Sequence, residues 1–296
     1  MKRLRFGSRK SALALAQTHM VMDAVKRAHP DYELELVPMV TTGDVNMKPF
    51  SDVTDKFGIK GLFTQELEEA LLNGTIDVAV HSLKDVPAMQ DERLPIIAYF
   101  RREDPRDALV LPEGDETIKG RVIGCSSARR RIQLNEIFAD FEILPVRGNV
   151  NTRLRKLDER QFSALTLAAA GLKRLGLEGR IHRYFSIEEV IPAPGQGILA
   201  CQGRAGGEYD EWLDAIHDTL STDCALAERT FSIALGGGCA SPVGAYARVS
   251  GSEMALFGFF ADEAKGIETR ASLTGERSQA EKLGEMLAEK ILRETR

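Results

Sequence analysis

The chain has 296 residues, of which 43% are hydrophobic and 28% are charged. These proportions are ordinary for a soluble globular protein, and the length suits two or three domains. The net charge of −5 argues against a general nucleic-acid-binding protein. No stretch approaches the ~20 apolar residues of a membrane span, and no signal-peptide apolar run follows the basic N-terminal residues. We therefore expect a cytoplasmic protein that binds neither nucleic acid nor a membrane.

Four cysteines occur in the chain, Cys125, Cys201, Cys224 and Cys239. No two have the spacing of a CxxC motif and none has a histidine at zinc-finger spacing, so we expect no metal site. In a reducing compartment all four should be free thiols. Any one of them is more readily explained as a small core residue than as a reactive group.

Strand and helix patterns alternate over the first two hundred residues. The helical spacing is clearest in Ser11–Ala28, where Leu13, Ala16, Met20 and Ala24 share one face. This alternation is typical of an α/β fold with helices packed on sheets. The predicted strands are Leu4–Phe6, Glu33–Val40, Ile76–Val80, Ile96–Phe100, Ala108–Leu111, Val122–Gly124, Ile143–Val146, Ala164–Leu167 and Ile198–Cys201. The other predicted helices are Thr64–Leu72, Ser127–Phe138 and Thr152–Glu159.

The C-terminal part has a different pattern. A predicted helix leads into three consecutive glycines, and three strand-like runs with short turns and an amphipathic helix follow. This order predicts a small α+β domain with a three-stranded antiparallel sheet. The predicted elements are the helix Asp223–Leu235, the strands Val243–Val249, Met254–Phe260 and Gly266–Leu273, and the helix Ser278–Leu292.

Two segments rich in turn formers, Arg101–Pro105 and Ile191–Gly197, interrupt the α/β part. If the chain leaves a first lobe at one and returns at the other, a cleft lies between two α/β lobes. We therefore predict domain 1 over residues 1–100 with 196–217, domain 2 over 101–195, and the C-terminal domain over 218–296.

Basic residues concentrate in the middle of this acidic chain. Three predicted helices begin among arginines, at Ser8–Ser11, Ser126–Arg131 and Arg147–Arg153. Cations at a helix N-terminus are disfavoured by about 0.3–1 kcal/mol each unless an anion binds there. The arginine fork matches a carboxylate, and no GxxxxGK[ST] phosphate loop is present. The pattern favours a ligand with several carboxylates over a merely solvated helical face.

Two other residues are candidates for chemistry. Asp85 follows the predicted strand Ile76–Val80, at the carboxyl end where α/β sheets bind ligands. It is either a turn residue or a carboxylate that stabilises a developing cation. His81, directly after the same strand, is interpreted as a hydrogen-bonded structural histidine. Cys239 follows three glycines, which allow close access to a ligand, in a loop that suits a tethered group.

These segments resemble, in order and over nearly the whole chain, the porphobilinogen deaminase (hydroxymethylbilane synthase) family. Any one segment alone is a weak signal, but their joint order is specific. They are Gly7-Ser8-Arg9-Lys10-Ser11-Ala12-Leu13-Ala14, Gly61-Leu62-Phe63, His81-Ser82-Leu83-Lys84-Asp85-Val86-Pro87, Arg102-Glu103-Asp104-Pro105-Arg106-Asp107-Ala108, Ser126-Ser127-Ala128-Arg129-Arg130, Arg147-Gly148-Asn149-Val150, Ala169-Ala170-Gly171-Leu172, Gly195-Gln196-Gly197 and Gly237-Gly238-Cys239.

The resemblance implies three domains, of which the first two are lobes like those of type II periplasmic binding proteins. It implies a transferase that joins four porphobilinogen molecules head to tail, releasing ammonia, to give hydroxymethylbilane for tetrapyrrole and heme biosynthesis. Cys239 matches the cysteine that holds a dipyrromethane cofactor through a thioether, and Asp85 matches the catalytic acid. Because the family is mostly monomeric, we expect a monomer.

The resemblance also implies which residues hold the acidic side chains of the pyrroles. This agrees with the residue patterns, since porphobilinogen carries two carboxylates. Asp85 would stabilise the azafulvenium cation that remains when ammonia leaves. The expected cofactor-binding residues are Lys84, Ser127, Arg129, Arg130 and Asp44, and the expected substrate-binding residues are Arg9, Ser11, Arg147, Arg153 and Arg174.

Two other classes of protein stay open from the residues alone. A non-catalytic two-lobed binding protein for polycarboxylate ligands explains the arginines and hinges, but neither Cys239 nor the third domain. An ordinary cysteine-dependent transferase needs a base near Cys239, whose nearest histidine in sequence is His217. The intact mass separates these classes, because a bound dipyrrole adds two pyrrole units.

Overall fold

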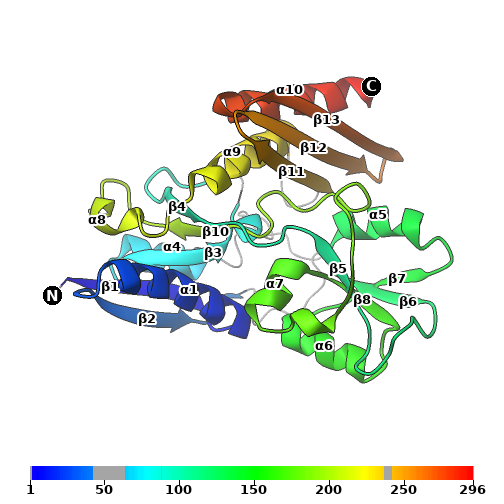
Figure 1. The fold of residues 1–296 in the computed structure, drawn as a ribbon, viewed down its shortest axis with the longest axis horizontal. Helices are drawn as coiled ribbons and strands as arrows, with labels where there is room; N and C mark the ends of the chain where they lie inside the picture. The colour runs from blue at the N-terminus through cyan, green and yellow to red at the C-terminus, as the bar shows by residue number, and fades with distance from the viewer. Residues whose placement is uncertain (1, 43–63, 88, 237–241, 296) are drawn as a thin grey trace. The chain divides into compact units, whose positions relative to one another are not determined.

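The protein is described from a computed structural model, which describes residues 2–42, 64–87, 89–236 and 242–295. It consists of two compact units (Figure 1). Unit 1 comprises Met1–Arg102 and Ile198–Leu226, and unit 2 comprises Glu103–Gly197 and Ala227–Arg296. The chain therefore passes between the units three times, twice at the segments that the sequence marks as rich in turn formers.

Unit 1 is built on a five-stranded sheet with the strand order β2-β1-β3-β10-β4. β1 is parallel to β2 and β3, whereas β10 is antiparallel to β3 and β4. The connection between the parallel strands β1 and β2 is a helix, α1, as parallel pairing requires. The strands are β1 (Arg3–Arg9), β2 (Glu33–Met39), β3 (Val78–Ser82), β4 (Ile96–Phe100) and β10 (Leu199–Gln202), and the helices are α1 (Ala12–Ala28), α4 (Gln65–Leu72), the 3-10 turn η2 (Leu83–Asp85) and α8 (Asp210–Leu213).

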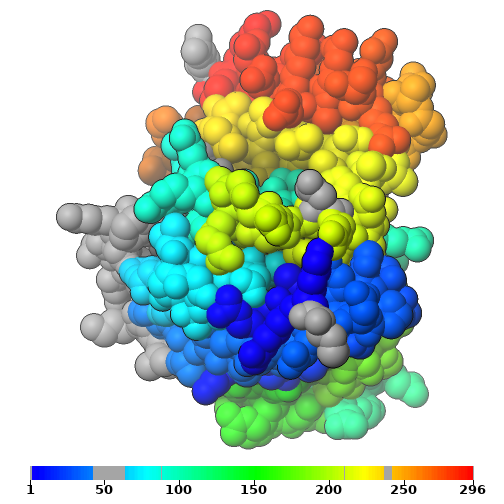
Figure 2. Space-filling model, turned by 90° about the vertical axis from the view of Figure 1, so that its left-hand side faces the viewer, coloured from blue at the N-terminus to red at the C-terminus, as the bar shows by residue number. Residues whose placement is uncertain are grey.

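The core of unit 1 lies between the sheet, α1 and α8. Phe6 of β1 meets Trp212 of α8 edge to face, with ring centroids 6.0 Å apart, and both side chains are fully buried. Figure 2 shows α8 in yellow-green on the surface beside the dark-blue N-terminal strand, where Lys2 pairs with Glu211. Apolar residues on the inner face of α1 pack against β1 and β3. The N-terminus of α1 lies at the carboxyl ends of these two strands.

Unit 2 contains a second five-stranded sheet, with the order β7-β6-β8-β5-β9. It repeats the pattern of the first: β6 is parallel to two neighbours, and β5 is antiparallel to β8 and β9. The strands are β5 (Asp107–Val110), β6 (Val122–Cys125), β7 (Glu142–Pro145), β8 (Ala164–Ala168) and β9 (Ile181–Tyr184), and the helices are α5 (Ala128–Ile137), α6 (Val150–Asp158), α7 (Ala169–Arg174) and the turn η3 (Glu178–Arg180).

Unit 2 also contains the antiparallel sheet β11-β12-β13. Buried residues of α10, such as Leu287, pack on one face of it, while Phe259 and Ala261 on β12 pack with Ile191 on the other. The long helix α9 belongs to unit 1 as far as Leu226 and to unit 2 from there on. The elements are α9 (Thr219–Ala234), β11 (Val243–Ser250), β12 (Glu253–Asp262), β13 (Ile267–Glu276), the turn η4 (Arg277–Gln279) and α10 (Ala280–Glu294).

The predicted fold class is confirmed: two α/β lobes and a small C-terminal α+β domain with a three-stranded antiparallel sheet. The helices α7 and α8 and the strand β9 were not predicted from the sequence, and the strand predicted from Ile76 begins at Val78. Ile76 still belongs to the turn after α4, since its N–H donates to the Ala70 carbonyl. Within the described ranges, no helix is both long and apolar enough to cross a bilayer.

Candidate functional site

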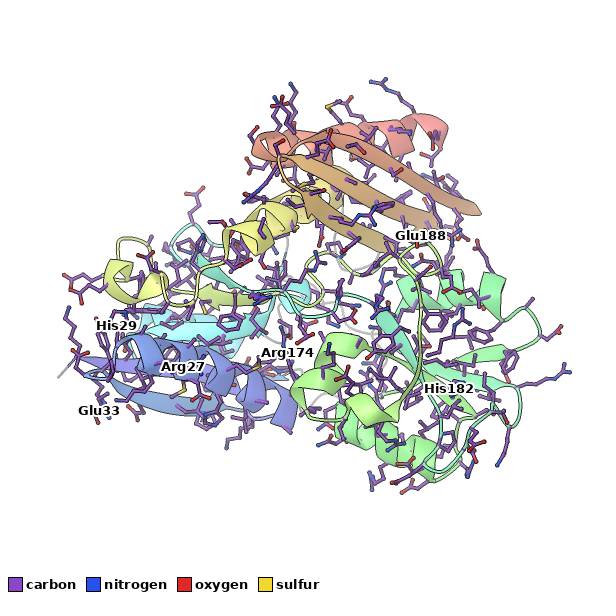
Figure 3. All side chains as sticks on the ribbon, viewed as in Figure 1. Arg27, His29, Glu33, Arg174, His182 and Glu188 are labelled. Atoms are coloured by element: carbon purple, nitrogen blue, oxygen red, sulfur yellow. The ribbon has the colours of Figure 1, made fainter. Side chains whose placement is uncertain are left out.

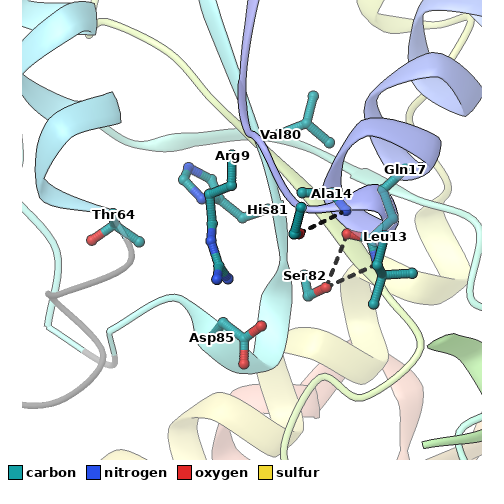
Figure 4. Close-up of a pocket in the computed structure, with 10 residues that line it drawn as sticks. Arg9, Leu13, Ala14, Gln17, Thr64, Val80, His81, Ser82 and Asp85 are labelled. Atoms are coloured by element: carbon teal, nitrogen blue, oxygen red, sulfur yellow. Dashed lines mark hydrogen bonds between the residues drawn. The ribbon is translucent and has the colours of Figure 1, made fainter. Parts of the chain in front are cut away.

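A small pocket of about 50 Å³ opens in unit 1 at the carboxyl ends of β1 and β3 (Figure 4). Three of the residues that the sequence singles out, Arg9, Ser11 and Asp85, line it together. The Arg9 guanidinium and the Asp85 carboxylate both project into this space in the close-up. The other lining residues are Leu13, Ala14, Gln17, Thr64, Val80, His81 and Ser82.

Asp85 is placed by a single 3-10 turn that follows β3. Leu83 and Val86 on either side are buried in the core of unit 1, and the Leu83 N–H donates to the Ile198 carbonyl at 3.0 Å. These anchors fix the turn, so Lys84 and Asp85 are left half-buried at the edge of the sheet. The turn that the sequence analysis weighed as an alternative therefore exists, and it directs the carboxylate into the pocket.

Ser11 caps the first long helix, as its position in the sequence predicts. Its hydroxyl oxygen accepts the Ala14 N–H at 3.3 Å, and the hydroxyl proton stays available as a donor. Arg9 is the last residue of β1. The pair places a guanidinium and a hydroxyl at the positive end of α1, an arrangement that suits a carboxylate.

His81 is buried in the wall of the pocket and its Nε2 lies 3.1 Å from the Gln202 side-chain oxygen. Burial lowers the pKa of His81 to about 4, although the Gln202 hydrogen bond and the Asp85 charge oppose the shift. The imidazole is therefore neutral near pH 7. This is the structural histidine that the sequence interpretation expects.

Gln17 is a pocket residue that the sequence analysis missed. It is buried on the inner face of α1, and its amide nitrogen lies 3.0 Å from the Ser82 hydroxyl. The sequence signal for Gln17 was its position. A polar residue four residues after Leu13 and four residues before Val21 lies on the apolar face of the helix.

In unit 2, the two arginines at the start of α5 converge on one buried carboxylate. Arg129 Nη2 lies 2.7 Å and Arg130 Nη2 lies 2.8 Å from the two oxygens of Asp107. The Gln196 amide donates to Asp107 Oδ1 at 2.8 Å. Burial alone would raise the pKa of Asp107, but the charges of Arg130 and Arg129 outweigh it and hold that pKa below its ordinary value.

Asp107 changes the interpretation of the helix-start arginines. From the sequence, a bound anion is expected to offset the unfavourable placement of arginines at a helix N-terminus. For the arginines of α5, the internal carboxylate of Asp107 provides part of this negative charge. Among the described residues, this cluster combines two guanidinium groups with one carboxylate, and its side chains are at most 6% exposed. The sequence signal for Asp107 was an acidic residue at the head of a fully buried strand.

The arginines around α6 connect the starts of two helices. Arg153 donates to the Gly148 carbonyl and to the Ser126 hydroxyl, both at 2.7 Å. Arg147 precedes the helix, and partial burial lowers its pKa. Ser127 occupies the N-cap position of α5 but makes no capping hydrogen bond there. Its hydroxyl is not committed to the helix end.

Arg174 is the last residue of α7 (Figure 3). Its Nη2 donates to the Gly197 carbonyl at 2.6 Å, and burial lowers its pKa to about 10. Its Nε is buried and meets no acceptor among the described residues, and the same holds for the Nε of Arg129. Buried guanidinium N–H groups without acceptors are unusual and suit an acidic ligand.

The predicted site residues therefore form two groups, each within its own unit. Arg9, Ser11, Lys84 and Asp85 lie at the strand ends of unit 1. In unit 2, a second group surrounds the starts of α5 and α6 and the end of α7. Both groups offer the donors that acidic pyrrole side chains require, so the residues fit a dipyrromethane. Asp44 and Cys239 lie outside the described residues. No described residues form a histidine, cysteine and carboxylate group suited to a metal ion.

Comparison with known proteins agrees with this chemistry. The family model of the porphobilinogen deaminase dipyrromethane cofactor binding domain matches residues 4–210, and that of the porphobilinogen deaminase C-terminal domain matches residues 222–293. The porphobilinogen deaminases of Ruminiclostridium josui and Acetivibrio thermocellus are 47% and 49% identical to the chain. Each alignment covers 98% of this chain and 98% of the relative.

Among solved structures, the chain is similar to the periplasmic aliphatic sulphonate binding protein SsuA from Escherichia coli. The identity is 13% and the TM-score 0.39, over 79% of this chain and 70% of that one. The full-length match to named deaminases does not favour the alternative of a non-catalytic binding protein. The chain belongs to the porphobilinogen deaminase (hydroxymethylbilane synthase) family, whose members hold a dipyrromethane cofactor.

Proposed function

We propose that Asp85 is the catalytic carboxylate of this enzyme, which joins four porphobilinogen molecules head to tail, releases ammonia and forms hydroxymethylbilane for tetrapyrrole biosynthesis. The observation that carries the proposal is the pocket at the strand ends of unit 1. Asp85 and Arg9 project into it, and Ser11 also lines it. A carboxylate next to carboxylate-binding groups suits a substrate that is both acidic and transiently cationic.

The proposed role of Asp85 follows from where charge develops. The aminomethyl group of porphobilinogen is protonated near pH 7. When its amino group leaves as ammonia, the nitrogen keeps the bonding electrons, and positive charge spreads over the pyrrole ring. A carboxylate that accepts the pyrrole N–H stabilises that charge. It can also hold the proton that a pyrrole carbon releases once the new carbon–carbon bond has formed. His81 is poorly suited to this task because an imidazole carries no negative charge and its Nε2 is engaged with the Gln202 side chain.

The arginines are proposed to bind and orient the acidic side chains. Forked guanidinium–carboxylate pairs fix direction as well as charge. Arg174 supports this role with a buried Nε that meets no acceptor among the described residues. The proposed substrate-binding residues are Arg9, Ser11, Arg147, Arg153 and Arg174, and the proposed cofactor-binding residues are Lys84, Ser127, Arg129, Arg130 and Asp44.

Cys239 is proposed as the thioether attachment point of the dipyrromethane. When bound, this group supplies the pyrrole carbon at which the chain grows. The other three cysteines support the assignment by their environment, since Cys125, Cys201 and Cys224 are all buried. Burial raises the pKa of Cys125, and it raises the pKa of Cys201 to about 12. A thiol held protonated in the core is a poor nucleophile.

We also propose that the enzyme acts as a cytoplasmic monomer with no nucleic-acid partner and with the three domains expected from the sequence. Domain 1 would comprise 1–100 with 196–217, domain 2 would comprise 101–195, and the attachment domain would comprise 218–296. The composition and the general behaviour of the family support this proposal. Sedimentation of the purified protein tests the oligomeric state, and limited proteolysis tests the boundaries.

Replacing Asp85 with asparagine tests its role directly. Asp85→Asn keeps the side-chain shape and removes the charge, so kcat should fall by at least ~10²-fold. The melting temperature and the bound pyrrole mass should not change. Asp91→Asn is the control, because Asp91 is also a carboxylate of unit 1 but pairs with Arg93 away from the pocket. Turnover near that of the unmodified enzyme in Asp85→Asn would remove the proposed role.

A further inference from the structure

Glu228 is a fully buried carboxylate that the proposed reaction does not use. It lies in the second half of α9 and has no exposed surface. The Gly195 N–H donates to its Oε2 and the Ala247 N–H donates to its Oε1, both at 2.7 Å. Burying a carboxylate is costly unless it is hydrogen bonded. Its two backbone hydrogen bonds offset this cost, and they show which segments Glu228 joins.

The two donors belong to segments that are distant in sequence. Gly195 lies in the segment 191–197, just before the chain returns to unit 1, and Ala247 lies in β11. β11 is at the edge of the sheet β11-β12-β13, so its outward N–H groups need partners. The Ala245 N–H donates to the Pro192 carbonyl at 2.8 Å, and the Ala247 N–H donates to Glu228. These two bonds satisfy two of the outward N–H groups of this edge strand.

Close packing holds the same elements in one arrangement. A Cβ at Gly244 of β11 would lie 2.9 Å from the Ile191 carbonyl oxygen. A Cβ at Gly284 of α10 would lie 2.5 Å from the Ala227 carbonyl oxygen of α9. Only glycine permits these approaches. Glu228 thus links α9 by hydrogen bonds to β11 and to the segment 191–197. These elements are already in close contact in this region.

The position of Glu228 relates it to Cys239. The chain leaves α9 at Ala234 and enters β11 at Val243, and Cys239 lies between these two ends. A bond from α9 to β11 therefore sets the spacing of the two ends of the cysteine-bearing segment (Figure 1 shows both elements). We infer that Glu228 is a positioning residue for cofactor attachment, because it links the two elements between which Cys239 lies in the sequence. This inference rests on the proposed attachment at Cys239.

Glu228→Gln tests this role with little change of shape. The amide oxygen can accept one of the two N–H groups, but the amide nitrogen then faces the other donor. We expect cofactor-free Glu228→Gln protein, incubated with porphobilinogen, to gain the dipyrrole mass about tenfold more slowly than the unmodified chain. Glu136→Gln is the matched control. Glu136 also connects α5 to β13 through a 2.8 Å ion pair with Arg270, but it is exposed. The Glu136→Gln protein should gain the pyrrole mass at the rate of the unmodified chain.

The outcomes separate positioning from stability. If Glu228→Gln melts earlier but its folded molecules gain the pyrrole mass as fast as the unmodified protein, Glu228 is only a structural residue and the inference fails. If Glu228→Gln does not fold, Glu228→Asp keeps both acceptor oxygens at a shorter reach. Slower loading of its folded molecules is then the expected result, and unchanged loading overturns the inference. Absence of pyrrole mass on Cys239 in the unmodified protein would instead contradict the proposed function.

Discussion

The two α/β sheets have the same strand pattern but present opposite chemistry at their polar sites. In unit 1, a half-buried acid, Asp85, lines an open pocket beside Arg9. In unit 2, Arg129 and Arg130 are buried on the shared acid Asp107. The first arrangement leaves a carboxylate accessible, as the role proposed for Asp85 beside a reacting cation requires. The second holds two guanidinium groups on one carboxylate, which suits the binding role proposed for them. On this proposal, the same strand pattern supports two different tasks.

Two acids, each shared by two arginines, allow this comparison to be tested. Asp107 in unit 2 is fully buried, whereas Asp77 in unit 1 is 17% exposed and pairs with Arg5 and Arg204 at 2.9 and 3.2 Å. Asp107→Asn should lower the free energy of unfolding by about 3–5 kcal/mol, because it leaves buried charges uncompensated. Asp77→Asn should lower it by only about 1–2 kcal/mol, since solvent screens its partners.

Urea denaturation of both variants measures this difference, with the spectroscopic signal followed at one pH and salt concentration. Equal losses in the two variants would contradict the account, because they would mean that burial does not distinguish the two clusters.

The pH dependence of stability should separate the same two units. The pKa of His81 is about 4 in the folded state against about 6.5 in the unfolded chain. Between these values the unfolded state binds the proton and the folded state does not, so stability falls as the pH falls from 6.5 to 4. The loss is about 3 kcal/mol. Asp107 has a lowered folded-state pKa, so its contribution is present above about pH 4 and is lost below it.

His81→Gln should flatten the unfolding free energy between pH 6.5 and 4 while leaving the loss below pH 4. Denaturation curves between pH 3 and pH 8 measure the unfolding free energy in both pH ranges. An unchanged slope above pH 4 in His81→Gln would show that the imidazole does not resist protonation in the fold.

Much of the fold was predictable from local pattern. Ile96–Phe100 was predicted to the residue because Pro95 and charged Arg101 bound a continuous apolar run. The edge strand Ile181–Tyr184 was missed because both of its central residues, His182 and Arg183, are exposed, so the run lacks a buried stripe. His182 is labelled in Figure 3. α7 has only six residues, too few to show a helical period.

The candidate site was predictable where its residues lie close together in sequence. Arg9 and Ser11, and Lys84 and Asp85, lie within single turns and could be placed at strand ends. The sharing of Asp107 by Arg129 and Gln196 could not be predicted, because these residues come from three distant segments and meet only through tertiary packing. The same holds for Glu228.

The smallest expected effect concerns the two serines at helix starts. Ser11 caps α1 through the Ala14 N–H, whereas Ser127 makes no capping bond on α5. Ser11→Ala should therefore cost about 1 kcal/mol of stability, and Ser127→Ala should cost no more than a few tenths. Thermal melts of the two variants measure the contrast. A larger loss in Ser127→Ala would show that its hydroxyl supports the fold.

The proposed reaction depends on a pyrrole group attached at Cys239, on which the product is built. The intact mass of the purified protein, followed by mass analysis of its peptides, tests this attachment most directly. We expect an added mass of two pyrrole units, located on the peptide that contains Cys239 and lost in Cys239→Ser. A protein without this mass, or the mass on the peptide of Cys125, Cys201 or Cys224 with Cys239 unmodified, would contradict the proposed attachment.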